Sequence, residues 1–196
     1  MNYVIVAENF PEKSCKKLKE YGNLVRTKSN KNLMKGLDSH TDILVHPLPD
    51  GEIVVDRDNL KYYKKIFLDK NIITSKSKLG AKYPLDIPLN AFKFKNYFIH
   101  NLKYTDEVLL DYYKNYGYEM INIKQGYAKC SSLVTDDFII TSDGGIYESL
   151  KDFVPIYKIN HGDIRLENFN YGFIGGASGV LGKKIFFTGD FSNHSS

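Results

Sequence analysis

The stretch YVIVAE at Tyr3–Glu8 is the first of five copies of one phrase, an apolar run that ends in a polar or acidic residue. The other copies are Ile53–Asp56 (IVVD), Tyr97–Asn101 (YFIHN), Phe138–Asp143 (FIITSD) and Ile185–Asp190 (IFFTGD). Their central residues lie 49, 44, 41 and 47 residues apart, and they are Val6, Val55, Ile99, Ile140 and Phe187. A nearly fixed period of this size is typical of a repeated supersecondary unit.

A helix is predicted after each of the first four copies, and a second strand is predicted after each helix. The predicted helices are Pro11–Tyr21, Asn59–Lys70, Thr105–Tyr116 and Gly145–Lys151. The predicted second strands are Leu24–Thr27, Ile72–Ser75, Tyr118–Ile123 and Val154–Lys158. A third strand, marked by glycine, precedes the next copy, so that the unit is strand, helix, strand, strand. This alternation indicates an α/β fold, and its fixed period favours a ring over a doubly wound sheet.

The fifth repeat is incomplete, because only Phe191–Ser196 (FSNHSS) follows its apolar run. By the length of the other repeats, about 35–40 residues are missing from a closed ring. A truncated sequence and an imperfectly closed ring both agree with this pattern. We therefore expect one domain over residues 1–196, a pseudo-five-fold α/β propeller that lacks part of its last repeat.

The composition excludes several classes of protein. The chain has 196 residues, 42% of them hydrophobic, and a net charge of +4 that comes from scattered lysines. This suits one soluble domain without a nucleic-acid partner. Its two cysteines make no disulfide framework and no zinc-finger spacing. No apolar run is long enough for a membrane span, and the first residues do not resemble a signal peptide. We expect a cytoplasmic protein with no metal and no cofactor.

His40 and Asp42 stand two residues apart in the segment HTDILV. On a strand, residues at this spacing point the same way, which would place an imidazole beside a carboxylate. Such a pair suits proton transfer next to a bound cation. A histidine at the edge of a loop and an aspartate that caps a turn are the structural alternative, which these two residues alone favour.

Gly126–Ser131 (GYAKCS) is the second segment with reactive groups. Its glycine permits a close backbone approach, and Lys129 beside Cys130 would favour the thiolate. A free cysteine is more often a small buried hydrophobic residue, so the structural alternative leads here as well.

Gly172–Gly179 (GFIGGASG) is the third such segment. It has neither the lysine of a phosphate-binding loop nor the spacing of a dinucleotide-binding loop. We expect it to be the closely packed start of a strand, where small residues are needed.

Taken together, these features resemble the pentein superfamily, the α/β propellers that modify guanidino groups, such as arginine deiminases and amidinotransferases. His40-Thr41-Asp42 matches the H-x-D segment of its catalytic histidine. Gly126 to Cys130 matches the G-x-x-x-C segment of its nucleophile, with Tyr127 in place of the usual second glycine. The separation of 90 residues between His40 and Cys130 is similar to that in compact members.

The resemblance implies a hydrolase or transferase that forms a covalent intermediate on Cys130, with His40 as the general acid and base. Polar residues near strand ends would bind a small polar or cationic substrate in a central channel. These candidate substrate-binding residues are Asp42, Asp86, Asn90, His100, Lys129 and Asp143. The chain is also similar to an uncharacterised clostridial-type family of pentein-like architecture, through the segments Tyr83–Ile87, Lys124–Ser131 and Tyr171–Gly179.

The chain departs from the superfamily pattern in two places. The nucleophile is usually in the last repeat, whereas here two repeats follow it, and the acidic motif expected one repeat before His40 is missing. Gly179 is taken as the counterpart of Cys130 in the next repeat, which therefore supplies no thiol. A non-catalytic binding or interaction module on the same fold remains the alternative function, and His161-Gly162-Asp163 is a reserve candidate for the histidine role.

Overall fold

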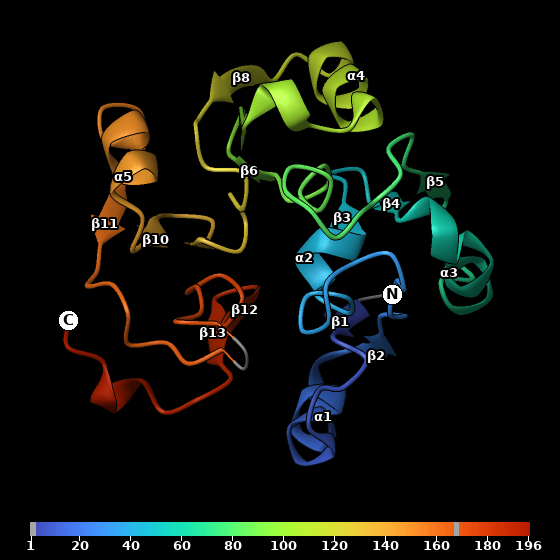
Figure 1. Ribbon diagram of the computed structural model, residues 1–196, viewed down its shortest axis with the longest axis horizontal. Helices are drawn as coiled ribbons and strands as arrows, with labels where there is room; N and C mark the ends of the chain where they lie inside the picture. Colours follow the sequence, from blue (N-terminus) through green and yellow to red (C-terminus); the bar gives the residue numbers. More distant parts are fainter. Residues whose placement is uncertain (1–2, 167–168) are drawn as a thin grey trace. The chain divides into compact units, whose positions relative to one another are not determined.

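The computed structural model describes residues 3–166 and 169–196, in which the strands form five small sheets of two or three strands each (Figure 1). The chain divides into two compact units. The first unit consists of the chain up to Leu89 and of Tyr104–Tyr112. The second consists of Asn90–Lys103 and Tyr113–Ser196.

The first unit holds a two-stranded and a three-stranded sheet. Its strands are β1 (Tyr3–Val6), β2 (Asn23–Arg26), β3 (Val45–Pro47), β4 (Ile53–Val55) and β5 (Ile72–Thr74). Its helices are α1 (Glu12–Leu18), α2 (Thr41–Leu44), α3 (Leu60–Ile66) and the 3-10 turns η1 (Lys19–Tyr21) and η2 (Arg57–Asn59). Strand β1 pairs with β2 in parallel, while β4 lies between antiparallel β3 and parallel β5.

The central position of β4 explains its sequence. Ile53, Val54 and Val55 are all buried, the last two completely. A strand that is covered on both faces is a continuous apolar run rather than an alternating one. Helix α3, which connects β4 to β5, places Tyr63 against this interior, and Phe67 stacks on Tyr63 directly after the helix.

The second unit contains two more central strands that pair as β4 does. Its strands are β6 (Phe92–Phe94), β7 (Tyr97–His100), β8 (Glu119–Asn122), β9 (Ser132–Val134), β10 (Ile139–Thr141), β11 (Ile156–Lys158), β12 (Ser178–Leu181) and β13 (Lys184–Phe187). Its remaining elements are α5 (Gly144–Leu150) and η4 (Phe191–Asn193), while η3 (Leu102–Tyr104) and α4 (Glu107–Asn115) lie at the boundary between the units. Strands β7 and β10 each have an antiparallel partner on one side and a parallel partner on the other.

The interior of the second unit is made by residues of β6, β7 and β10, by loop residues and by the apolar face of α5, which packs beside β10 and β11 (Figure 1). Its buried members are Phe92, Phe94, Ile99, Ile123, Ala128, Ile139, Ile146, Leu150 and Val154. Strands β12 and β13 form an antiparallel pair, which η4 follows.

The acidic residue that ends the repeated phrase is a helix cap in three repeats. Asp56 accepts a hydrogen bond from the N–H of Asp58 at the start of η2, and Asp143 accepts one from Ile146 in α5. Asp190 accepts one from Ser192 in η4. A carboxylate at this position satisfies a backbone donor that has no partner within the helix, so the polar end of the phrase has a structural cause.

The mixed α/β class predicted from the repeats is confirmed, and the predicted helices and second strands occur within a few residues of their expected bounds. No closed sheet occurs among the described strands, so the propeller arrangement stays a proposal. Within residues 3–166 and 169–196, every helix is too short or too polar to cross a membrane.

Glu8, just after β1, provides a prediction for the pH dependence of stability. Its carboxylate accepts hydrogen bonds from Lys28 Nζ at 2.8 Å and from the Ser29 N–H at 2.9 Å, which lower the pKa of Glu8 to about 2. Because the folded pKa is depressed, the stabilisation is present above the ordinary value of 4.5 and is lost as the pH falls towards 2. Glu8→Gln should therefore lower Tm at pH 7 by about 2 °C, a small effect because the pair is partly exposed.

Thermal unfolding followed between pH 7 and pH 2 tests this expectation. The Tm difference between wild type and Glu8→Gln should shrink as the pH falls through the range from 4.5 to 2. Glu20→Gln, at an exposed glutamate in η1, is the matched control. A difference between wild type and Glu8→Gln that is constant with pH would contradict the assigned role of the Glu8 carboxylate.

Candidate functional site

His40 and Asp42 lie at the start of α2 in the first unit. The prediction that they stand on a strand is wrong: His40 directly precedes α2, and its carbonyl accepts hydrogen bonds from the N–H groups of Ile43 and Leu44. Both side chains are half-buried, and a ring nitrogen of His40 lies within 4.8 Å of a carboxylate oxygen of Asp42. The imidazole is therefore close to a carboxylate, although a helical turn rather than a strand brings them together.

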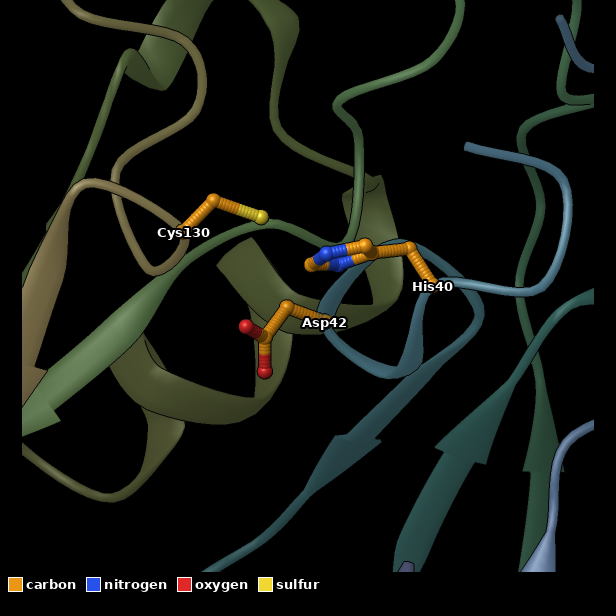
Figure 2. Close-up of side chains that lie close together, drawn as sticks. All are labelled: His40, Asp42 and Cys130. Atoms are coloured by element: carbon orange, nitrogen blue, oxygen red, sulfur yellow. The ribbon is translucent and has the colours of Figure 1, made fainter. Parts of the chain in front are cut away.

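Cys130 lies in the second unit, on the loop that leads from β8 to β9 (Figure 2). The loop ends in one helical turn, which a hydrogen bond from the Ser131 N–H to the Tyr127 carbonyl closes at 2.9 Å. Cys130 is only 4% exposed. The free thiol is thus held on a tight turn directly before a strand.

Asn90 contacts this turn at three points. Its carbonyl accepts from the Lys129 N–H at 3.0 Å, and its Oδ1 accepts from the Cys130 N–H at 3.1 Å. Its Nδ2 lies 3.0 Å from Cys130 Sγ as a donor. Asn90 is fully buried. The amide of a buried polar side chain therefore contacts the sulfur atom.

Two more of the predicted substrate-binding residues support the same loop. His100, at the end of β7, is fully buried, and its Nε2 lies 2.9 Å from the Gly126 carbonyl. The Asp143 carboxylate accepts from Gln125 Nε2 at 2.7 Å, and Gln125 in turn accepts from the Tyr127 N–H. These contacts give His100 and Asp143 a structural role in shaping the Cys130 loop.

Gly175 closes the other side of the Cys130 turn. A Cβ atom at this position would lie 2.1 Å from the Lys129 carbonyl oxygen, 2.4 Å from that of Ser132 and 2.7 Å from that of Cys130. The next residue, Gly176, donates its N–H to the Cys130 carbonyl at 3.0 Å. The prediction that the glycine-rich segment is a closely packed start of a strand is confirmed, since β12 begins two residues later.

The register of the hairpins corrects one sequence assignment. Ser132 opens β9 opposite the last residue of β10, and Ser178 opens β12 opposite the last residue of β13. Counting back two residues, Gly176 rather than Gly179 is the counterpart of Cys130. The conclusion that this repeat supplies no thiol is unchanged.

The remaining candidates are divided between the units. Asp86 is buried in a loop of the first unit and Lys129 is half-buried beside Cys130 in the second. The two members of the reserve pair have different partners: His161 is exposed and contacts Tyr171, while Asp163 accepts hydrogen bonds from Ser195 that lower the pKa of the Asp163 carboxyl. A different imidazole, that of His194, lies beside Asp163, with 3.6 Å between His194 Nδ1 and Asp163 Oδ2.

The sequence does not predict the supporting roles of Gln125 and Thr141, nor the contact of Gly175 with the Cys130 turn. Thr141 Oγ1 donates to the Ser131 carbonyl at 2.8 Å. Gly175 stands in a glycine pair that is plain in the sequence, but the sequence does not show that the pair packs against the Cys130 turn. Gln125 and Thr141 carry no such signal, because a single amide or hydroxyl in a repeat is common.

Comparison with known protein families assigns the chain to one of them. Residues 5–196 match the family of unknown function DUF6873. The chain belongs to this family. No curated protein matches this chain.

Among solved structures, the DUF6873 chain is similar to apo ArgZ, an arginine dihydrolase from the ornithine-ammonia cycle in cyanobacteria. The TM-score is 0.50 with 14% identity, over 82% of this chain and 28% of the ArgZ chain. It is also similar to the N-terminal domain of ArgZ(N71S) covalently bound to a reaction intermediate, with a TM-score of 0.48 and 9% identity over 81% of this chain and 64% of that one. The chain thus spans less than two thirds of either structure, and the first likeness shows a pentein-like fold alone.

Proposed function

We propose that this chain is a pentein-like enzyme that hydrolyses or transfers the amidino group of a small guanidino compound through a covalent intermediate on Cys130. The observation on which the proposal mainly rests is the imidazole–carboxylate pair of His40 and Asp42, within 4.8 Å at one helix start. A thiol fixed in an ordered turn and a fold similar to that of an arginine dihydrolase add support.

The proposed chemistry needs only groups of the chain, the substrate and water. Cys130 Sγ attacks the planar guanidino carbon as a thiolate, a C–S bond forms, and one C–N bond breaks as His40 protonates the departing amine. His40 then takes a proton from water, the resulting hydroxide attacks the same carbon, and the C–S bond breaks to release a ureido product and the thiolate. Asp42 would bind the cationic guanidinium through charge-assisted hydrogen bonds.

In this proposal Cys130 is the nucleophile, His40 the general acid and base, and Asp42 the group that binds the cationic substrate. The finer arrangement that we propose is one domain with five propeller-like repeats around a channel that takes a small polar or cationic molecule. We keep Asp86 and Lys129 as proposed substrate-binding residues, whereas the side chains of Asn90, His100 and Asp143 hold the Cys130 loop.

The pH dependence of Cys130 alkylation tests the proposed pair. In a Cys15→Ser background, the rate of modification by iodoacetamide should have a midpoint below the ordinary thiol value of about 8.5, because a nearby imidazolium stabilises the thiolate. His40→Ala should raise this midpoint, so that the rate at pH 7 falls by about tenfold. His161→Ala, at an exposed histidine of the second unit, is the matched control. Equal midpoints in wild type and His40→Ala would rule out the pair.

A non-catalytic binding module is the second candidate function, and the burial of Cys130 favours it. At 4% exposure the thiol has the environment of many structural cysteines. Incubation of the wild-type protein with L-arginine and agmatine, followed by detection of ammonia and ureido product, separates the two functions. A binding module would retain such a compound without converting it.

A further inference from the structure

The side chain of Asn90 engages Cys130 with both of its polar atoms. The backbone N–H of Cys130 can only donate, so the atom that faces it must be the amide oxygen. The amide nitrogen therefore faces Sγ, at 3.0 Å. The two contacts assign the orientation of the amide, which a single contact could not do.

The backbone keeps this amide in place. Asn90 lies two residues before β6, as Cys130 lies two residues before β9, and the Asn90 carbonyl accepts the N–H of Lys129. Gly176 contacts the Cys130 carbonyl from two residues before β12. Adjoining repeats of the second unit thus hold the Cys130 turn from both sides, and the fully buried Asn90 has little freedom to turn its amide away.

An N–H donor has a different effect on the two forms of a thiol. A hydrogen bond to an ionised acceptor is about twice as strong as one to a neutral acceptor. An amide N–H that points at Sγ therefore stabilises the thiolate more than the thiol, and it also fixes the direction in which the sulfur lone pairs are available. Donors of this kind lower the pKa of a cysteine.

We propose that Asn90 is the positioning residue of Cys130, which holds Sγ and stabilises its thiolate form, rather than a residue that binds substrate. This rests on the proposed function, in which Sγ is the nucleophile. In a purely structural role, Asn90 would only tie the loop to β6 through its Oδ1 and its carbonyl. The two roles differ in what happens to thiol ionisation when the donor is removed.

Two variants test this inference, and Asn90→Asp, which keeps the shape and the acceptor of the side chain and replaces the donor with a negatively charged oxygen, gives the larger shift. In a Cys15→Ser background, the alkylation midpoint should move to higher pH, and the rate with iodoacetamide at pH 7 should fall by about tenfold. Asn90→Ala removes the donor without adding charge and should shift the midpoint in the same direction by a smaller amount. Asn96→Asp, in the exposed turn between β6 and β7, is the control with the same change of charge.

The shape of the pH profile separates the outcomes. A structural role would change the plateau rate of Asn90→Ala at high pH, through altered access to the sulfur, and leave its midpoint as in wild type; that result would overturn the inference. If Asn90→Asp fails to fold, as judged by circular dichroism, the midpoint of Asn90→Ala decides. A shifted midpoint in a protein that converts neither L-arginine nor agmatine would support the inference and count against the proposed function, so the two can fail separately.

Discussion

Replacing Cys130 with alanine is expected to reduce turnover of a guanidino substrate by about a thousandfold or more, because the proposed covalent intermediate forms on the Cys130 sulfur. The second cysteine cannot substitute for it. Cys15 is buried in α1 of the first unit, where Arg26 donates to its sulfur at 3.1 Å. Release of ammonia from L-arginine or agmatine, measured for wild type, Cys130→Ala and Cys15→Ser, checks this expectation, and Cys15→Ser should retain activity.

The stability of the same variants distinguishes a nucleophile from a core residue. Cys130→Ala removes one sulfur atom and one hydrogen bond from Asn90, while the backbone contacts of the turn remain. We therefore expect Cys130→Ala to unfold within about 2 kcal/mol of wild type in urea. A protein that loses its fold on this substitution would identify Cys130 as a packing residue, and one that keeps full turnover would refute the proposed chemistry.

The repeated strands could be predicted because a buried strand requires a run of apolar residues, and such a run is visible in the sequence. Ile53, Val54 and Val55 lie in a central strand, and the polar Asp56 that follows caps the next turn. Where a run is short and continuous, the pattern is ambiguous between strand and helix. Ile43 and Leu44 follow Asp42 in such a run, and the structure closes one helical turn there before β3 begins.

The contacts around Cys130 could not be predicted in the same way. Asn90 and Cys130 are 40 residues apart, and nothing periodic marks an amide that will face a thiol. The candidates near strand ends were identified as polar positions, but only tertiary structure shows that His100 and Asp143 support the Cys130 loop. Which polar residue reaches which partner depends on hairpin register, and register also makes Gly176, rather than the predicted Gly179, the counterpart of Cys130.

Gly175→Ala should produce the largest loss of stability among single-methyl additions to the Cys130 turn. The added Cβ would meet three backbone oxygens, those of Lys129, Ser132 and Cys130, all at 2.7 Å or less. Backbone atoms cannot move aside by changing a rotamer, so the turn or β12 must shift. An overpacked site of this kind costs about 3 kcal/mol, which corresponds to a fall in Tm of about 10 °C for a chain of this length.

Gly179→Ala provides a matched control within the same glycine-rich segment, because its added Cβ would meet no atom within 4 Å. Thermal and urea unfolding of the two variants should therefore differ sharply, with Gly179→Ala close to wild type. If Gly175→Ala is as stable as Gly179→Ala, the close approach to the Cys130 turn does not exist in solution. If Gly175→Ala is destabilised as expected but still folds, the Cys130 thiol of this variant should be alkylated with an altered plateau rate, because the displaced turn contains Cys130.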